Sequence, residues 1–266
     1  GGGSAIPEAV SIVSKLISWH DFADNLNDGW GAYPLTESSS GLTYANASTG
    51  GSGPSGRCVS AGRARSYNAF PYDAATGQHV TAFAMVSTDA FTNTFPVIGI
   101  QDFDNQGGIC DLTETADTWR FKGTTTIFGV TGSVFAPSLR PVDAWNLIGY
   151  STRSGGTAYI HHNASHRLSS AAVGTLLLPS KLLLGTASTS TTSKVAFTGT
   201  MQGEPTSAEW TYLYNSGVGR TIAGIISDAG YSAPAIRYGG TGTTTAEQAT
   251  SVPGNYIARV AAASGI

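Results

Sequence analysis

Asp102, Asp104 and Asn105 are the residues of this sequence whose types and spacing best suit chemistry, as oxygen ligands of a hard cation. Asp102 and Asp104 are two positions apart, so on a strand both carboxylates point to the same face. Calcium prefers such oxygens together with backbone carbonyls. Asp-x-Asp-Asn before two glycines is also common in turns. The pattern therefore leaves two interpretations, a calcium site and an ordinary turn.

His161, His162 and His166 form the densest group of imidazoles in the chain. His161 and His162 are adjacent, so on a strand they point to opposite faces. A hairpin would bring His162 and His166 together, but no cysteine or carboxylate lies nearby in the sequence. We interpret the group as a polar hairpin tip rather than a metal site.

Patterns that would support catalysis are missing from the sequence. Glycoside hydrolysis needs two carboxylates roughly 5–10 Å apart, which on one strand would appear as Glu-x-Asp-x-Glu. The nearest run, Asp111-Leu112-Thr113-Glu114, has the wrong period. There is no Gly-x-Ser-x-Gly nucleophile motif either. The sequence predicts a protein that is not an enzyme.

Sugar binding calls for exposed aromatic rings beside amide and hydroxyl groups. Aromatic residues in loop-like segments are the candidates for such contacts: Trp30, Tyr33, Tyr67, Tyr72 and Tyr231. The other tryptophans lie in patterned strands or in a terminal helix and are predicted to be core: Trp19, Trp119, Trp145 and Trp210.

Composition excludes several classes of partner. Charged residues make up only 12% of the 266 residues and the net charge is −3, without any basic run. Nucleic acid and anionic membrane surfaces are therefore not expected partners. The longest apolar run, residues 175–185, is too short and too interrupted to span a bilayer. Cys58 and Cys110 are read as two buried thiols or as one bridge.

Strand and turn patterns dominate the order of elements. We predict a short helix over residues 8–16, strands over residues 16–22, 56–62, 78–86, 95–102, 119–122 and 126–130, and a hairpin of residues 144–150 with 157–161. A strand over residues 180–186 is the last predicted for the core, and a helix over residues 207–214 follows. This spacing favours an antiparallel β-sandwich over βαβ units.

The order of short motifs at both ends resembles a known family. Trp19 is followed by Asn25-x-Asn27-Asp28-Gly29, and Phe197-Thr198-Gly199 is followed by a helix bearing Trp210 and a Tyr-Asn-x-Gly-x-Gly stop. This order resembles the laminin-G/concanavalin A-like jelly roll found in bacteriophage structural proteins. The resemblance implies an all-β concanavalin A-like jelly roll with extended N- and C-terminal segments.

The same resemblance implies a function. It implies a non-enzymatic virion protein, a capsid decoration or a tail or fibre component, whose jelly roll contacts host-surface polysaccharide. Its partners would be other virion proteins or copies of itself, and it would be assembled in the host cytoplasm and act outside the cell. The alternative is a carbohydrate-binding or adhesin module of a bacterial extracellular protein.

Three segments are predicted: an N-terminal arm of residues 1–15, a jelly roll of residues 16–222 and a C-terminal extension of residues 223–266. In the extension, residues 223–227 and 235–238 are predicted as edge strands, docked either on a neighbouring subunit or on their own domain. Two departures from the family pattern stand out. The strand before the terminal helix looks shortened, and Ala164 replaces the usual glycine of a hairpin.

Overall fold

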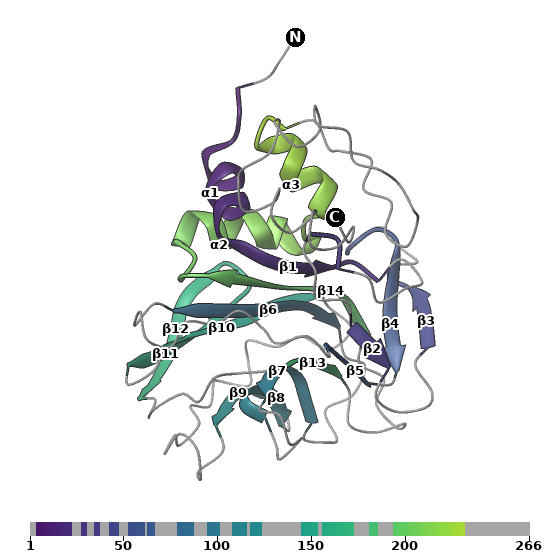
Figure 1. The fold of residues 1–266 in the computed structure, drawn as a ribbon, viewed down its shortest axis with the longest axis vertical. Coiled ribbons are helices and arrows are strands. Elements are labelled where there is room, and N and C mark those ends of the chain that lie inside the picture. Colours follow the sequence, from purple (N-terminus) through teal and green to yellow (C-terminus); the bar gives the residue numbers. More distant parts are fainter. Residues whose placement is uncertain are drawn as a thin grey trace, which may run out of the picture.

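The protein is an antiparallel β-sandwich with three helices on one outer face (Figure 1). The computed structural model describes residues 4–22, 28–30, 35–37, 43–47, 53–61, 63–66, 79–87, 95–101, 108–115, 118–123, 145–153, 156–172, 181–185 and 194–231. Every strand pairing among these residues is antiparallel. The predicted all-β fold class is confirmed. None of the described helices is long and apolar enough to cross a membrane.

The larger sheet has eight strands. Their order is β12 (Ser165–Ala172), β11 (Thr157–His162), β10 (Asn146–Thr152), β6 (Val80–Ser87), β14 (Lys194–Gln202), β4 (Arg57–Ala61) and β3 (Thr43–Asn46), and β1 (Leu16–His20) also pairs with β14. The smaller sheet has the order β2 (Leu35–Glu37), β5 (Arg63–Ser66), β13 (Lys181–Gly185), β7 (Phe95–Gln101), β8 (Gly108–Thr115) and β9 (Thr118–Gly123). The predicted hairpin of β10 with β11 is confirmed by direct pairing, with Tyr150 opposite Ile160.

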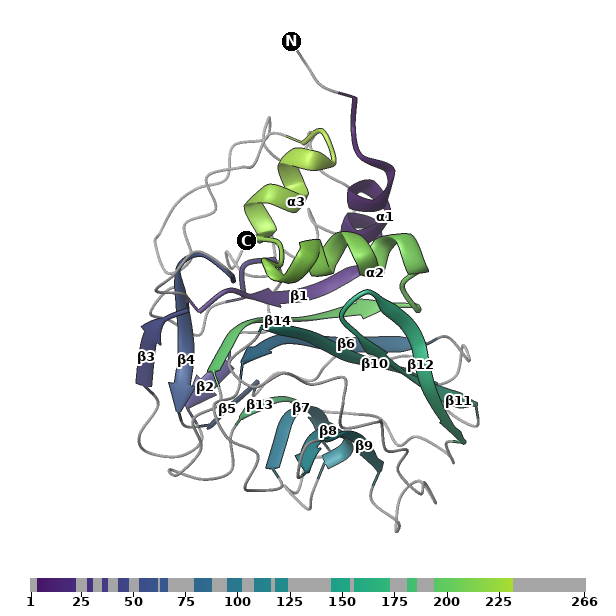
Figure 2. The same ribbon diagram turned by 180° about the vertical axis from the view of Figure 1, so that it is seen from behind.

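Helices α1 (Pro7–Lys15), α2 (Ser207–Tyr214) and α3 (Ile222–Asp228) cover the larger sheet on the side away from the smaller one (Figure 2). Between them and the sheet lies an aromatic core. The Trp19 ring stacks on Phe197 at 4.7 Å and meets Phe83 edge-on at 5.6 Å. Trp210 of α2, also fully buried, meets Phe83 at 88°. The predicted core positions of Trp19, Trp145 and Trp210 are confirmed.

Two glycines of the larger sheet, Gly149 and Gly199, leave the space that these rings occupy. A Cβ added at Gly149 would lie 2.8 Å from the Trp210 ring and 2.9 Å from the Ala82 carbonyl oxygen. A Cβ at Gly199 would lie 2.4 Å from the Phe83 ring. A side chain at Gly149 would therefore displace the Trp210 ring of α2, and one at Gly199 would displace the Phe83 ring.

Helix α2 begins at a capping box. The Thr206 side chain accepts a hydrogen bond from the Glu209 amide, and the Glu209 carboxylate accepts one from the Thr206 amide. Glu209 also binds Lys15 of α1 at 2.8 Å, which ties the N-terminal helix to α2. The helix ends at Asn215, whose φ of 45° is left-handed. The predicted helix and its stop signal are confirmed.

The core extends beyond the predicted segment boundaries at residues 15 and 222. Ile12 and Val13 of α1 and Ile225 and Ile226 of α3 belong to the same buried cluster as Trp19. The predicted edge strand at residues 223–227 is wrong, because that segment is helical. The apolar residues Ile222, Ile225 and Ile226 have the i, i+3, i+4 spacing of one helix face, and the Thr221 side chain caps the Gly224 amide.

Two further expectations are corrected. The strand at residues 180–186 is not the last of the core, since β14 follows it and pairs with β6. Between the end of β14 at Gln202 and the start of α2 the chain forms a turn and no further strand, in agreement with the shortened strand that the sequence predicts there. The hairpin with Ala164 keeps a tight turn because Asn163 takes the left-handed conformation, with a φ of 51°, that glycine would otherwise supply. Cys58 is a free buried thiol, as in the first of the two cysteine readings.

Candidate functional site

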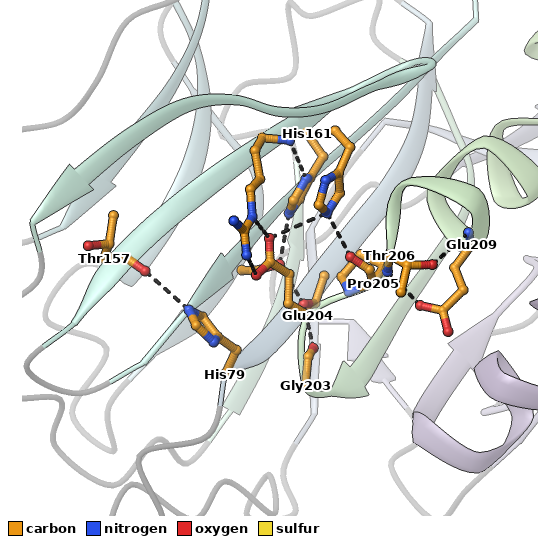
Figure 3. A network of polar contacts seen from close by, with 12 residues as sticks. His79, Thr157, His161, Gly203, Glu204, Pro205, Thr206 and Glu209 are labelled. Atoms are coloured by element: carbon orange, nitrogen blue, oxygen red, sulfur yellow. Dashed lines mark hydrogen bonds and ion pairs between the residues drawn. The ribbon is translucent and has the colours of Figure 1, made fainter.

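A compact group of polar side chains lies where the β11–β12 hairpin meets the turn between β14 and α2 (Figure 3). It consists of His161, His166 and Arg167 from the hairpin and Glu204 from the turn, and we refer to these four residues as the polar cluster. The cluster joins an edge of the larger sheet to the start of α2. It brings two imidazoles, a guanidinium and a carboxylate into contact.

His161 is the buried centre of the cluster. Its side chain is fully buried, and its ring lies 5.0 Å from that of Trp210, so it points to the helix-covered face of the sheet. The Nδ1 atom accepts a hydrogen bond from the Arg167 amide at 3.1 Å. Because Nδ1 is the acceptor, the proton of a neutral ring must be on Nε2. That proton is donated to Ser151 Oγ at 2.8 Å.

The hydrogen bonds continue in one direction beneath the cluster. Ser151 Oγ lies 2.7 Å from Thr81 Oγ1, which donates to the Gly203 carbonyl oxygen at 2.8 Å. With His161 donating to Ser151, each hydroxyl accepts from one neighbour and donates to the next. This series of hydrogen bonds links β11, β10 and β6 to Gly203, the residue that precedes Glu204. It therefore fixes the position of that turn relative to the sheet.

Burial keeps His161 neutral. Removal from water, and next the nearby His166, Arg167 and His79, lower the pKa of His161 from 6.5 to about 3. Protonation would place a second donor at Nδ1 opposite the Arg167 amide and break that hydrogen bond. His161 therefore acts as a fixed acceptor for the hairpin backbone.

His166 covers the outer face of His161. The two rings stack with centroids 4.8 Å apart and planes 21° apart. His166 Nε2 donates to the Pro205 carbonyl oxygen at 2.7 Å and lies 3.4 Å from Glu204 Oε1. These contacts attach the hairpin to the turn before α2.

Arg167 carries the exposed part of the cluster. Its φ of 53° is left-handed, a conformation that is costly for a residue with a long side chain. Its guanidinium forms a two-pronged ion pair with Glu204, with Nε to Oε1 at 2.7 Å and Nη2 to Oε2 at 2.8 Å. Glu204 raises the pKa of Arg167 further above its ordinary value. The guanidinium also lies 4.4 Å above the centre of the Tyr159 ring.

Tyr159 and His79 extend the surface along the sheet edge. Their ring centroids lie 5.9 Å apart, and a His79 ring nitrogen lies 3.3 Å from the Thr157 carbonyl oxygen. Tyr159 is two residues before His161 on β11, so both side chains point to the same face of the sheet. The result is a row of planar side chains: His79, Tyr159 and the Arg167 guanidinium.

The polar cluster contains the one group of possible metal ligands that the described residues form. Donor atoms of His161, His166 and Glu204 all lie within 4.8 Å of one another. A zinc ion would need each donor within about 2.0–2.2 Å. Binding would cost His161 one of its two ring hydrogen bonds, with Ser151 or with the Arg167 amide, and Glu204 its ion pair, and the Arg167 cation would repel the metal. The arrangement fits a hydrogen-bonded network better than a metal site.

Two of the aromatic residues that the sequence proposes for sugar binding, Trp30 and Tyr231, lie in the described part of the structure. Trp30 is buried, with 1% of its surface exposed, and its ring N–H donates to the Leu16 carbonyl oxygen at 2.8 Å. The prediction that the Trp30 ring binds sugar is therefore wrong, because the ring belongs to the buried core cluster and is bonded to the backbone of β1. Tyr231 packs partly buried against the same core.

The other candidate positions lie outside the described residues: Tyr33, Tyr67, Tyr72, Asp102, Asp104 and Asn105. The aromatic candidates and the calcium site at these positions stay predictions.

Sequence reasoning placed the histidines at a hairpin tip but paired the wrong two. His161 meets His166, whereas His162 points to the opposite face and contacts Asn146 at 3.1 Å. Tyr159 was missed although its two-residue spacing from His161 was a usable signal. Glu204 had no such signal, since it lies 37 residues from Arg167 in the sequence.

No protein-family model matches the chain, and no curated protein matches it. Solved structures do match. The binding domain of botulinum neurotoxin serotype D has a TM-score of 0.55 at 10% identity, covering 76% of this chain and 51% of that one. The binding domain of Paraclostridial Mosquitocidal Protein 1 has a TM-score of 0.55 at 12% identity, covering 76% and 52%.

Domain 4 of AbnA, an extracellular arabinanase of Geobacillus stearothermophilus solved in complex with arabinotriose, has a TM-score of 0.51 at 14% identity. That match covers 74% of this chain and 97% of the arabinanase domain. The chain spans about half the length of the two toxin binding domains and nearly all of the arabinanase domain. At these identities the likeness shows the fold, a β-sandwich shared with carbohydrate- and receptor-binding domains.

Proposed function

We propose that this chain is a non-enzymatic recognition module that binds glycans. The observation that carries the proposal is the match to AbnA domain 4, which extends over 97% of that domain and was solved with arabinotriose bound. A sandwich of the same extent is sufficient there to hold an oligosaccharide. The neutral surface of this chain, with only 12% charged residues, suits uncharged polar ligands.

The roles of three described carboxylates support a binding protein over an enzyme. Glu204 is held by Arg167, Glu209 by Lys15 and the cap of α2, and Asp28 by the amides of Trp19 and Trp30. Hydrolysis of a glycosidic bond requires one carboxyl to donate a proton and another to act as a nucleophile or base. Carboxylates committed to cations and backbone amides are poorly suited to either task.

We place the module on a virion, as a capsid decoration or a tail or fibre component that acts outside the cell. The support is the resemblance to phage laminin-G-like jelly rolls, including the helix stop after Trp210. Its partners in this setting are other virion proteins, copies of itself and host-surface polysaccharide. An adhesin module of a bacterial extracellular protein is the alternative that shares the glycan-binding step.

A glycan array tests the binding step. The intact chain is applied with calcium and with chelator, and we expect retention of a defined neutral glycan. A blank array in both conditions would contradict the proposal. The setting is tested separately by mass spectrometry of purified particles from the source culture. Stoichiometric presence in particles supports the virion, and presence only in the cell-surface fraction supports the adhesin.

A further inference from the structure

The exposed side of the polar cluster has the construction of a ligand-contact surface. Arg167 is an arginine whose side chain is 52% exposed, yet three separate contacts hold it in place. The Arg167 amide donates a hydrogen bond to His161, and the guanidinium donates to the Glu204 carboxylate. The guanidinium also packs on the face of the Tyr159 ring. An exposed arginine without such contacts would move freely among rotamers.

We propose that the Arg167–Glu204 pair, supported by Tyr159, is the contact surface for a neutral sugar with adjacent hydroxyl groups. This inference rests on the proposed glycan-binding function and gives it a site and a ligand class. The residues that line the surface are Arg167, Glu204, Tyr159, His79 and His166.

The donors and acceptors of the pair match those of a diol. A guanidinium has five N–H donors, and the two bonds to Glu204 use two of them. No residue that the structure describes engages the remaining three. Each Glu204 oxygen keeps lone-pair capacity beyond its bond to Arg167. A hydroxyl both donates and accepts, so two adjacent hydroxyls can bind the guanidinium edge and the carboxylate together.

The ligand class follows from the charge of the surface. Arg167 and Glu204 neutralise each other across bonds of 2.7 and 2.8 Å. A sugar carboxylate approaching Arg167 would also approach the Glu204 carboxylate and be repelled. Neutral sugars avoid this repulsion, so we expect them to bind better than sialylated or uronic sugars.

The rigid support explains why binding at one arginine can be measurable. Ordering a flexible side chain opposes association, and a side chain that is already ordered avoids that cost. His161, locked as a neutral acceptor, is a positioning residue here. It contacts the Arg167 backbone and does not reach the exposed surface.

The test is a titration of the intact chain with arabinotriose, maltotriose, 3′-sialyllactose and any glycan retained on the array. The Arg167 Nε–H resonance, identified by its loss in Arg167→Lys, reports contact at the site. We expect a neutral sugar to shift this resonance saturably. Arg167→Lys and Glu204→Gln should each weaken binding by roughly ten- to a hundredfold, the range for hydrogen bonds to charged groups.

Arg57→Lys is the matched control. Arg57 also forms a guanidinium bond across two strands, to Asn46 Oδ1 at 2.9 Å, but at the opposite end of the larger sheet. Its replacement should leave affinity unchanged. Tyr159→Leu provides a second variant that removes the support beneath the guanidinium, and it should also weaken binding. Thermal melting of each variant identifies any that fails to fold.

Each contrary outcome has its own meaning. A neutral sugar that binds the wild type and Arg167→Lys equally well overturns this site and leaves the glycan-binding function standing. Tighter binding of 3′-sialyllactose than of the neutral sugars overturns the ligand class. A wild type that binds none of the probes removes the proposed function, and this inference with it.

Discussion

Replacing His161 by asparagine should remove a large part of the acid sensitivity of folding. In the wild type His161 is fully buried and neutral, with its Nδ1 atom accepting a bond from the Arg167 amide. An asparagine side-chain oxygen can accept the same bond but does not bind a proton in this pH range. The substitution therefore separates the titration of His161 from its hydrogen bond to the hairpin.

The size of the effect follows from the two pKa values. His161 has a pKa of about 3 in the folded protein, against 6.5 when exposed. Between these values the unfolded chain binds a proton that the folded chain does not, so stability is full above pH 6.5 and is lost as the pH falls toward 3. At pH 5 this linkage lowers the free energy of unfolding by about 2 kcal/mol, relative to pH 8.

Urea unfolding followed by far-UV circular dichroism, at several pH values from 8 to 5, measures this change. We expect the wild type to lose about 2 kcal/mol more than His161→Asn over that range. The variant will be less stable at pH 8, because it loses the bond to Ser151, but its pH dependence should be shallower. His79→Asn is the control, since it removes a histidine from the same surface that is the smallest of the named contributors to the lowered pKa of His161, so most of the pH dependence should remain. Equal slopes for the wild type and His161→Asn would refute the reasoning.

Three other changes test the packing that supports the cluster. Gly149→Ala should lower the free energy of unfolding by about 1–3 kcal/mol, because the new Cβ meets the Trp210 ring and the Ala82 carbonyl oxygen. Gly156→Ala is the control, since its new Cβ meets the flexible Arg153 side chain, and its stability in the same urea titration should remain near that of the wild type. Thr206→Ala removes the α2 cap and should cost about 1 kcal/mol, whereas Thr206→Ser should restore it. Trp210→Ala should cost about 3–5 kcal/mol and lower the melting temperature, and a variant that melts like the wild type would contradict the assigned core.

Local patterns in the sequence were sufficient for much of the fold. Alternating apolar residues predicted β1, β6 and the β10–β11 hairpin, because side chains alternate faces along a strand. The helix at residues 207–214 followed from its Trp210 and Leu213 anchors and its glycine stop. Each of these signals lies within a few residues of the element that it specifies, so no knowledge of the chain path was needed.

Segments that the sequence misassigned have competing local signals. Residues 223–227 read as a strand because Ile225 and Ile226 are β-branched, and the helical spacing with Ile222 became decisive only once α1 offered that face a partner. Trp30 lies in a turn-rich segment, and its ring is buried in the core cluster, where it donates a hydrogen bond to Leu16, fourteen residues away. Turn residues specify the reversal of the chain and say little about which side chain the reversal buries.

The amino-acid sequence by itself indicated the antiparallel sandwich, the terminal helix and the histidine-bearing hairpin, because turn signals and side-chain periodicity are local. Only the tertiary structure decided that Glu204 meets Arg167 across 37 residues, and that Lys15 meets Glu209 across 194. It also decided that His161 is the buried, neutral member of the histidine pair. Burial and charge pairing depend on which distant segments the chain path brings together, and no spacing along the sequence encodes that path directly.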